Sequence, residues 1–307
     1  MIGKFAGWTA LAGILLWSLA AAAADQQAAY VEKGAEGCLK CHDKPPVTLV
    51  LRTSHAMSAD SRAPFATHAC ETCHGASPKH LVKPEEGEKR APTAISFLPG
   101  SKNSVTEQNA VCLDCHSGGH QMNWKGSEHQ FAGVACSGCH SVHVRKDPML
   151  QKAEQAEVCF ECHAMQRAES HRPYRHPIVE GLTTCSDCHD SHGSSTEHLL
   201  AGNTLNDVCY KCHAEKRGPF LWEHAPARED CSLCHASHGS SHRGMLKTLA
   251  PLLCQQCHIA PYHSSELYDG SRLAFPTAQR SLLGRSCLNC HSQVHGSNHP
   301  SGVRQMR

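Results

Sequence analysis

The chain has 307 residues, of which 26 are histidine, 20 are cysteine and only 5% are aromatic. So few aromatic side chains argue against an ordinary apolar core, and the length argues against a small domain held together by disulfides. Lysine and arginine number 29 against 28 for aspartate and glutamate, so the basic excess that nucleic-acid binding requires is missing. We expect no nucleic-acid partner, and we expect something other than disulfides to engage the thiols.

The first 24 residues have the features of an export signal. Lys4 is the only charged residue before Asp25, residues 11–19 form an apolar run, and residues 22–24 are alanines that suit signal-peptidase cleavage. We interpret residues 1–24 as a signal peptide. An uncleaved membrane anchor is the alternative, although the apolar stretch has about 15 residues and a spanning helix needs ~20.

Every cysteine belongs to a Cys-x-x-Cys-His unit, and ten such units account for all twenty cysteines. The cysteines of the units are Cys38 and Cys41, Cys70 and Cys73, Cys112 and Cys115, Cys136 and Cys139, Cys159 and Cys162, Cys185 and Cys188, Cys209 and Cys212, Cys231 and Cys234, Cys254 and Cys257, and Cys287 and Cys290. The histidines that end the units are His42, His74, His116, His140, His163, His189, His213, His235, His258 and His291.

Cys-x-x-Cys-His is the attachment signature of c-type haem. Positions i, i+3 and i+4 share one face of a helical turn, so both thiols can form thioethers to the haem vinyl groups while the imidazole reaches the iron. Zinc ribbons also contain Cys-x-x-Cys pairs, but zinc coordination gives no reason for a histidine after every second cysteine. Thioredoxin-like redox chemistry fails for the same reason. The sequence therefore predicts ten covalently attached c-type haems, whose porphyrins form the core.

Each iron also needs a sixth ligand, and ten of the other histidines recur in a pattern. The units form five consecutive pairs, and in the three middle pairs one histidine precedes the second unit by 7 to 9 residues while another follows that unit's own histidine by three. The outer pairs repeat this with looser spacing. The predicted distal ligands are His55, His80, His129, His143, His176, His192, His224, His238, His263 and His295, with His299 as the alternative to His295.

Six histidines remain, and we expect them to be surface or hydrogen-bonding residues: His68, His120, His171, His198, His242 and His299. The seven methionines show no repeat position, which argues against the Met ligation that raises a haem potential. We therefore expect every haem to be bis-His and low in potential.

The expected fold class is a multihaem cytochrome c, mainly coil and short helices wrapped around a linear array of ten haems, with little or no β-sheet. Ser104 and Glu107 form a capping-box pattern ahead of Cys112, residues 152–169 contain few helix breakers, and Asn206 or Asp207 can cap a turn at Cys209. The stretch 78–99 and the Gly-Ser tracts after two of the predicted distal ligands are expected to be loops.

Three segments carry a resemblance to a known family: residues 209–226, residues 245–258 and residues 284–302. They resemble the periplasmic decahaem cytochromes of the MtrA/DmsE type. The resemblance implies an elongated haem wire of two pentahaem modules, with residues 25–170 as the first and 171–307 as the second.

The resemblance also implies partners and a location. Such a wire inserts into an outer-membrane β-barrel protein, so the chain would lie in the periplasm in association with the outer membrane. Electrons would pass between periplasmic or inner-membrane cytochromes and the exterior, either directly or through a multihaem cytochrome on the cell surface, in metal reduction or Fe(II) oxidation.

We expect an electron-transfer protein and not an enzyme. A catalytic metal site needs an open coordination position, whereas no unit replaces its histidine with lysine and the histidines suffice to fill every sixth position. A soluble periplasmic electron shuttle is the first alternative. A multihaem redox enzyme is the second.

Overall fold

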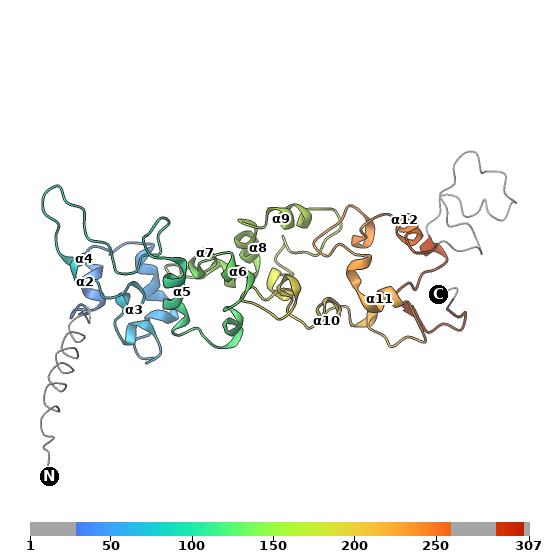
Figure 1. The fold of residues 1–307 in the computed structure, drawn as a ribbon, viewed down its shortest axis with the longest axis horizontal. Helices are drawn as coiled ribbons and strands as arrows, with labels where there is room; N and C mark the ends of the chain where they lie inside the picture. Colours follow the sequence, from blue (N-terminus) through green and yellow to red (C-terminus); the bar gives the residue numbers. More distant parts are fainter. Residues whose placement is uncertain (1–28, 259–286, 304–307) are drawn as a thin grey trace, which may run out of the picture. The chain divides into compact units, whose positions relative to one another are not determined.

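The computed structural model describes residues 29–258 and 287–303 (Figure 1). The predicted signal peptide and the predicted ligand His263 lie outside the described residues. Most of the described chain is coil, and its α-helices are short, with none longer than 9 residues. They are α2 (Ala35–Leu39), α3 (Cys70–His74), α4 (Pro78–Leu81), α5 (Val105–Leu113), α6 (Glu128–Phe131), α7 (Cys136–Cys139), α8 (Lys152–Phe160), α9 (Ala164–Ser170), α10 (Leu205–Tyr210), α11 (Ala225–Glu229) and α12 (Ala250–Gln255).

Short 3₁₀-helices supply most of the remaining regular structure. They are η1 (Val47–Arg52), η2 (Ser54–Ala56), η3 (Pro64–Ala66), η4 (Gly119–Asn123), η5 (Pro148–Leu150), η6 (Cys185–Asp187), η7 (Glu197–Leu199), η8 (Ala214–Lys216), η9 (Cys231–Leu233), η10 (Arg243–Met245) and η11 (Cys287–Asn289). A 3₁₀ turn is tighter than an α-turn and is used in short pieces and connectors. No helix in the part of the chain that the structure describes is long and apolar enough to cross a membrane.

The sheet content is minimal. β1 (Trp222–Glu223) pairs antiparallel with β2 (Gly296–Ser297), and this two-stranded ladder is the one named sheet in residues 29–258 and 287–303. The backbone N–H of Leu221 donates to Asn298 Oδ1 over 2.7 Å, which extends the pairing. The prediction of coil and short helices with little β-sheet is confirmed.

The sequence predicts the start of one helix and the extent of another helical stretch, and the structure can be compared with both. Ser104 Oγ accepts the backbone N–H of Glu107, and a Glu107 carboxylate oxygen accepts the backbone N–H of Ser104 over 2.7 Å, so the predicted capping box is confirmed at the start of α5. The helical stretch expected in residues 152–169 divides into α8 and α9, because the fifth Cys-x-x-Cys-His unit interrupts it.

The predicted cap near Cys209 is wrong by a few residues. Thr204 is the residue that caps α10, and its hydroxyl accepts the backbone N–H of Asp207. Asn206 is buried and serves a neighbouring turn instead, since its side chain accepts the backbone N–H of Cys231 over 2.8 Å. It therefore connects the seventh unit to the eighth.

The hydrophobic core is small. In the described residues one cluster of buried side chains forms, from Ala156, Phe160 and Ile178, and the partly buried Cys185 packs against it. Large hydrophobic side chains such as Leu182 and Phe131 are exposed, at 75% and 81%. A chain of this length normally buries most of its apolar surface. Exposed side chains of this size therefore fit contact with a large apolar group that is not part of the polypeptide, such as a porphyrin.

The chain divides into two compact units. Of the described residues, the first comprises 29–115 and 142–145, and the second comprises 116–141, 146–258 and 287–303. In the first unit, α3 packs against η3 and α5; in the second, α8 packs against η5, α9 and η6. The division at residue 170 concerns haem modules, and it stays a prediction.

Candidate haem-binding sites

Each Cys-x-x-Cys-His unit forms one tight turn. In eight units the backbone N–H of the histidine donates to the carbonyl of the first cysteine, four residues earlier, at 2.9–3.1 Å, and a ninth unit is itself the helix α3. A four-residue helical bond places both cysteines and the histidine on one face. None of the twenty cysteines is in a disulfide, so all of the thiols are available for thioether bonds.

The thiols of successive units face one another. Hydrogen bonds join the first cysteines in the pairs Cys38 and Cys70, Cys159 and Cys185, Cys209 and Cys231, and Cys254 and Cys287. The second cysteines interact in the pairs Cys73 and Cys115, Cys139 and Cys162, Cys188 and Cys212, and Cys234 and Cys257. Inside each compact unit, consecutive attachment sites are therefore neighbours, meeting alternately at the first and at the second cysteine.

Burial affects the ionisation of these thiols. Desolvation raises the pKa of Cys70 to about 11, with the neighbouring Cys38 thiol as a further cause. A buried thiol resists forming the charged thiolate. Before haem attachment this cysteine is accordingly protonated at neutral pH.

The motif histidines lie opposite other histidines at a nearly constant separation. Eight motif histidines have such a partner, and the ring centroids are 6.0–6.3 Å apart. The pairs are His42 with His80, His74 with His143, His163 with His129, His140 with His192, His213 with His176, His189 with His238, His258 with His224, and His235 with His295. Every partner in this list is a histidine that the sequence predicts as a distal ligand.

This separation is wider than direct face-to-face contact, and it fits a metal between the rings. Direct stacking looks different, as in Tyr30 and His68, whose parallel rings are 3.5 Å apart. A nitrogen–metal bond of about 2.0 Å on each side, with about 1.2 Å from nitrogen to ring centre, separates two ligand rings by about 6.4 Å. The histidine pairs therefore fit the two axial positions of a haem iron.

Hydrogen bonds at Nδ1 hold many of these rings in place. Backbone carbonyls lie at hydrogen-bond distance from Nδ1 of seven of the paired histidines: His74, His80, His129, His143, His176, His189 and His235. A carbonyl can only accept, so Nδ1 carries the proton and Nε2 keeps its lone pair for a metal. A metal-bound histidine usually donates its other ring N–H to a carbonyl or carboxylate in this way, which fixes the orientation of the ring.

Burial favours the neutral imidazole at four of the paired positions. Desolvation is the largest cause that lowers the pKa of His74, His192, His238 and His295. Only a neutral imidazole can donate a lone pair to iron. The lowered pKa values and the facing arrangement of the rings therefore both favour metal binding at these four histidines.

Glycine follows three of the distal candidates because the chain passes very close to other groups there. Gly193 and Gly239 have φ of +125° and +147°, and a Cβ would collide with a backbone carbonyl, that of Asn123 or of Glu169. At Gly296, with φ of +145°, a Cβ would collide with the Phe220 ring. The His-Gly dipeptide is therefore a requirement of the site, and the Gly-Ser tracts are more than loops.

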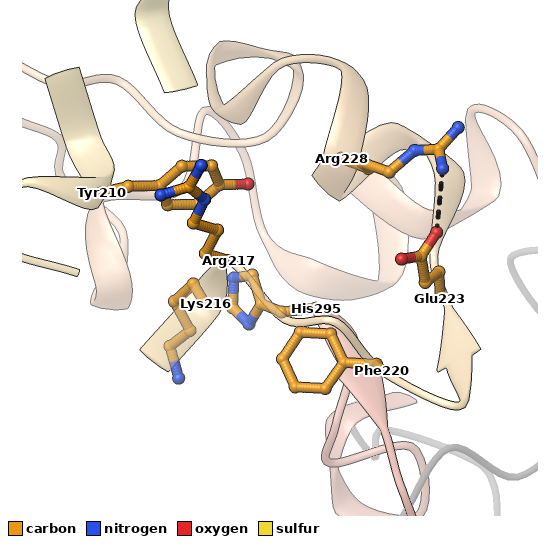
Figure 2. A pocket seen from close by; sticks show the side chains of 7 residues that line it. All are labelled: Tyr210, Lys216, Arg217, Phe220, Glu223, Arg228 and His295. Carbon is orange, nitrogen blue, oxygen red and sulfur yellow. Dashed lines mark hydrogen bonds and ion pairs between the residues drawn. The ribbon is translucent and has the colours of Figure 1, made fainter. Parts of the chain in front are cut away.

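Three basic side chains line a pocket beside His295, and one of them is paired with a carboxylate (Figure 2). Lys216, Arg217 and Arg228 line it together with Phe220 and Glu223, and Arg228 Nη1 donates to Glu223 Oε2 over 3.1 Å. After burial, Lys216 is the next cause that lowers the pKa of His295. Haem carries two propionate carboxylates, which suit a rim of lysine and arginine side chains.

The other predicted ligands are placed less completely. His55, His116 and His291 are among the described residues and engage in interactions of their own. Of the spare histidines, His171 Nδ1 lies 2.8 Å from the carbonyl of Arg167, and His120 is highly exposed. The alternative ligand His299 accepts the backbone N–H of Ser301 at Nδ1.

Sequence reasoning missed the carboxylates that face some of the rings. Asp147 Oδ2 lies 2.6 Å from His140 Nδ1, Asp190 Oδ1 lies 3.9 Å from His192 Nδ1, and Glu169 Oε2 lies 3.5 Å from His238 Nδ1. Asp190 lies between His189 and His192 in the sequence, and this position could have predicted a carboxylate close to a ligand ring. No sequence pattern marks Asp147 or Glu169.

Comparison with known proteins decides the family. The chain is 49% identical over 276 residues to the multiheme cytochrome MtrA of Shewanella baltica, and the match covers 89% of this chain and 81% of that protein. The chain belongs to the MtrA family of multihaem c-type cytochromes. The resemblance found in the sequence is thereby confirmed, and covalent c-type haem and an electron-transfer role follow from membership.

Weaker matches agree with the MtrA family. Residues 176–218 and 224–261 match the family described as a doubled CXXCH motif, and residues 70–155 match the family described as cytochrome c-type protein NrfB-like. The cytochrome c-type protein NrfB of Escherichia coli is 32% identical over 173 residues, which cover 51% of this chain and 85% of that protein. The protein of the same name from Haemophilus influenzae is 29% identical over 151 residues, or 42% of this chain and 65% of that protein.

Proposed function

We propose that the chain is a decahaem electron wire, exported to the periplasm, that carries electrons through a separate outer-membrane barrel protein. The observation that carries the proposal is the set of eight histidine pairs with ring centroids 6.0–6.3 Å apart. The twenty cysteines would hold ten haems, and the ten motif histidines would be their proximal ligands. His55 and His263 complete the predicted set of ten distal ligands.

The haems supply one-electron redox chemistry when bound, and the polypeptide supplies position and electrostatics. The paired imidazoles would fill both axial positions of an iron, which leaves no site for a substrate to bind the metal. Contacts between the thiols of consecutive units keep neighbouring attachment sites close. These features favour electron transfer over substrate chemistry.

The partner proposal rests on family membership and on secondary structure. Lipid accepts only closed barrels or long helices as spanning elements, and the helices described here reach no more than 9 residues. A wire that crosses the outer membrane would then need a barrel around it. Periplasmic or inner-membrane cytochromes would exchange electrons at one end and a multihaem cytochrome on the cell surface at the other.

We expect the mature protein to carry ten haems. Each attached haem adds roughly 616 Da at one Cys-x-x-Cys-His unit. Intact-mass spectrometry of protein matured with its own signal peptide measures both the haem number and the cleavage site. A mass that corresponds to nine or fewer haems in fully matured protein would contradict the count.

We expect the chain to conduct electrons across a bilayer only together with a barrel. The barrel complex, or the barrel protein alone, would be inserted into the bilayer of liposomes that enclose an electron-accepting dye. A reductant would then be added outside the liposomes. Dye reduction should be many times faster with the complex. Equal rates, or failure of the cytochrome to co-purify with any barrel from native membranes, would favour the soluble shuttle.

A further inference from the structure

Four motif histidines occupy equivalent positions, at the second unit of each of the first four pairs, but one of them has a different hydrogen-bond acceptor. Three Nδ1 atoms face neutral backbone carbonyls, and the fourth faces a carboxylate. The Nδ1 distances are 3.2 Å from His74 to Ile95 O, 2.7 Å from His189 to His198 O, 2.8 Å from His235 to Gly244 O, and 2.6 Å from His140 to Asp147 Oδ2. These four histidines therefore differ in the charge of the group that accepts their Nδ1 proton: it is neutral for three of them and anionic for His140.

The Asp147 carboxylate is held firmly in this position. Its side chain is 13% exposed, and its other oxygen, Oδ1, accepts the backbone N–H groups of Ser141 at 3.3 Å and Met149 at 3.2 Å. The second of these bonds caps η5, which begins directly after Asp147. Because the backbone holds Oδ1, the carboxylate is fixed in orientation and Oδ2 stays directed at His140.

The opposite ring of the same pair also lies near a carboxylate. His192 is nearly parallel to His140, with an angle of 7° between the rings, and Asp190 lies 3.9 Å from His192 Nδ1. Among the eight described pairs, two others have a carboxylate on one ring only. Glu169 lies 3.5 Å from His238, and Glu215 lies 3.7 Å from His213 but is 60% exposed.

We propose that Asp147, assisted by Asp190, makes the iron held between His140 and His192 the last in the chain to be reduced. The inference rests on the proposed ligation by these two histidines. A carboxylate that accepts the Nδ1 proton makes the imidazole a stronger donor and stabilises the ferric iron. A nearby anion acts in the same direction, and its field is poorly screened because Asp147 is largely buried.

A site of this kind has a consequence for electron flow. When the wire is partly reduced, electrons occupy the other irons and leave the His140–His192 position ferric. Each electron that passes this iron then has to cross one energetically uphill position. Asp147 and Asp190 are positioning residues in this role, since neither one contacts the iron.

The test is a spectroelectrochemical titration of the complete holoprotein and of Asp147→Asn. Asparagine removes the charge and keeps one oxygen, which can cap η5 while the amide NH2 group takes the place of the oxygen that accepts from His140. We expect the most negative component, equal to one haem, to become about tenfold easier to reduce, which is about 59 mV for a one-electron couple. Asp190→Asn should shift the same component by less.

Glu215→Gln is the matched control, because it removes one negative charge beside a motif histidine at an exposed position. It should leave the titration curve nearly unchanged. An unmoved low-potential component in Asp147→Asn, or an equal shift in Glu215→Gln, would overturn the inference.

Electron paramagnetic resonance keeps this inference separate from the proposed function. If the wild-type protein contained high-spin haem, the ligation itself would be wrong. If Asp147→Asn alone became high-spin, the ring would have moved, and Asp190→Asn would then decide whether the low-potential component responds to the carboxylates.

Discussion

The chain without haem should fail to fold. Only ten hydrophobic side chains are buried among more than two hundred described residues. Ordering each residue costs roughly 1–2 kcal/mol in conformational entropy, which so few buried side chains cannot offset. The attached haems must supply the missing apolar contacts, in the same way that a structural metal folds a small zinc domain.

The measurement compares the mature chain produced without haem attachment with the matured holoprotein. Far-UV circular dichroism should show a disordered chain, and limited proteolysis should digest it at least tenfold faster than the holoprotein. A smaller change is expected for Cys159→Ala combined with Cys162→Ala, which removes one haem beside Phe160. A haem-free chain that shows cooperative thermal unfolding would contradict this prediction.

The histidine pairs reveal a rule of connectivity that the sequence did not show. The histidine between the units of one pair faces the first motif histidine of the next pair, as His129 faces His163. The histidine that trails a pair faces the second motif histidine of the preceding pair, as His192 faces His140. Seven of the eight described histidine pairs follow this rule, and His42 with His80 stays within its own pair.

Spacing alone identified the candidate ligands because attachment is local. A Cys-x-x-Cys-His unit needs only one helical turn, and in the three middle pairs the distal histidines keep similar offsets from the units, so both repeat visibly in the chain. The pairing of each distal histidine with a motif histidine depends on how the coil segments cross between repeats. Coil has no periodicity that would predict such a crossing, so the pairing of His224 with His258 needed the structure.

The groups that accept hydrogen bonds from the histidine rings could not be predicted from the sequence either. His176 Nδ1 lies 3.0 Å from the carbonyl of Ser237, far along the chain, and any residue could supply that carbonyl. Asp147 gave no signal either, because its spacing from His140 does not recur in the other repeats. The interlocked pairs explain why the ligands alternate with the units, since each repeat contributes an imidazole to both of its neighbours.

Replacing His176 with alanine should convert one haem from low-spin to high-spin. His176 faces His213 with ring centroids 6.2 Å apart, and Ser237 holds its Nδ1, so its loss would leave an iron with one axial ligand and an open position. About one high-spin haem per molecule should appear in electron paramagnetic resonance, and the reduced protein should bind one carbon monoxide. The other haems should keep their spectra.

His171→Ala is the matched control on the same segment. Its Nδ1 also lies near a backbone carbonyl, that of Arg167 at 2.8 Å, but its side chain is exposed and no histidine ring faces it in the described parts of the chain. Unlike His176→Ala, this variant should stay fully low-spin. Should His176→Ala stay low-spin as well, or should His171→Ala become high-spin, the assignment of distal ligands by repeat position would have to be abandoned, because the 6 Å ring separation would no longer distinguish an axial ligand from a surface histidine.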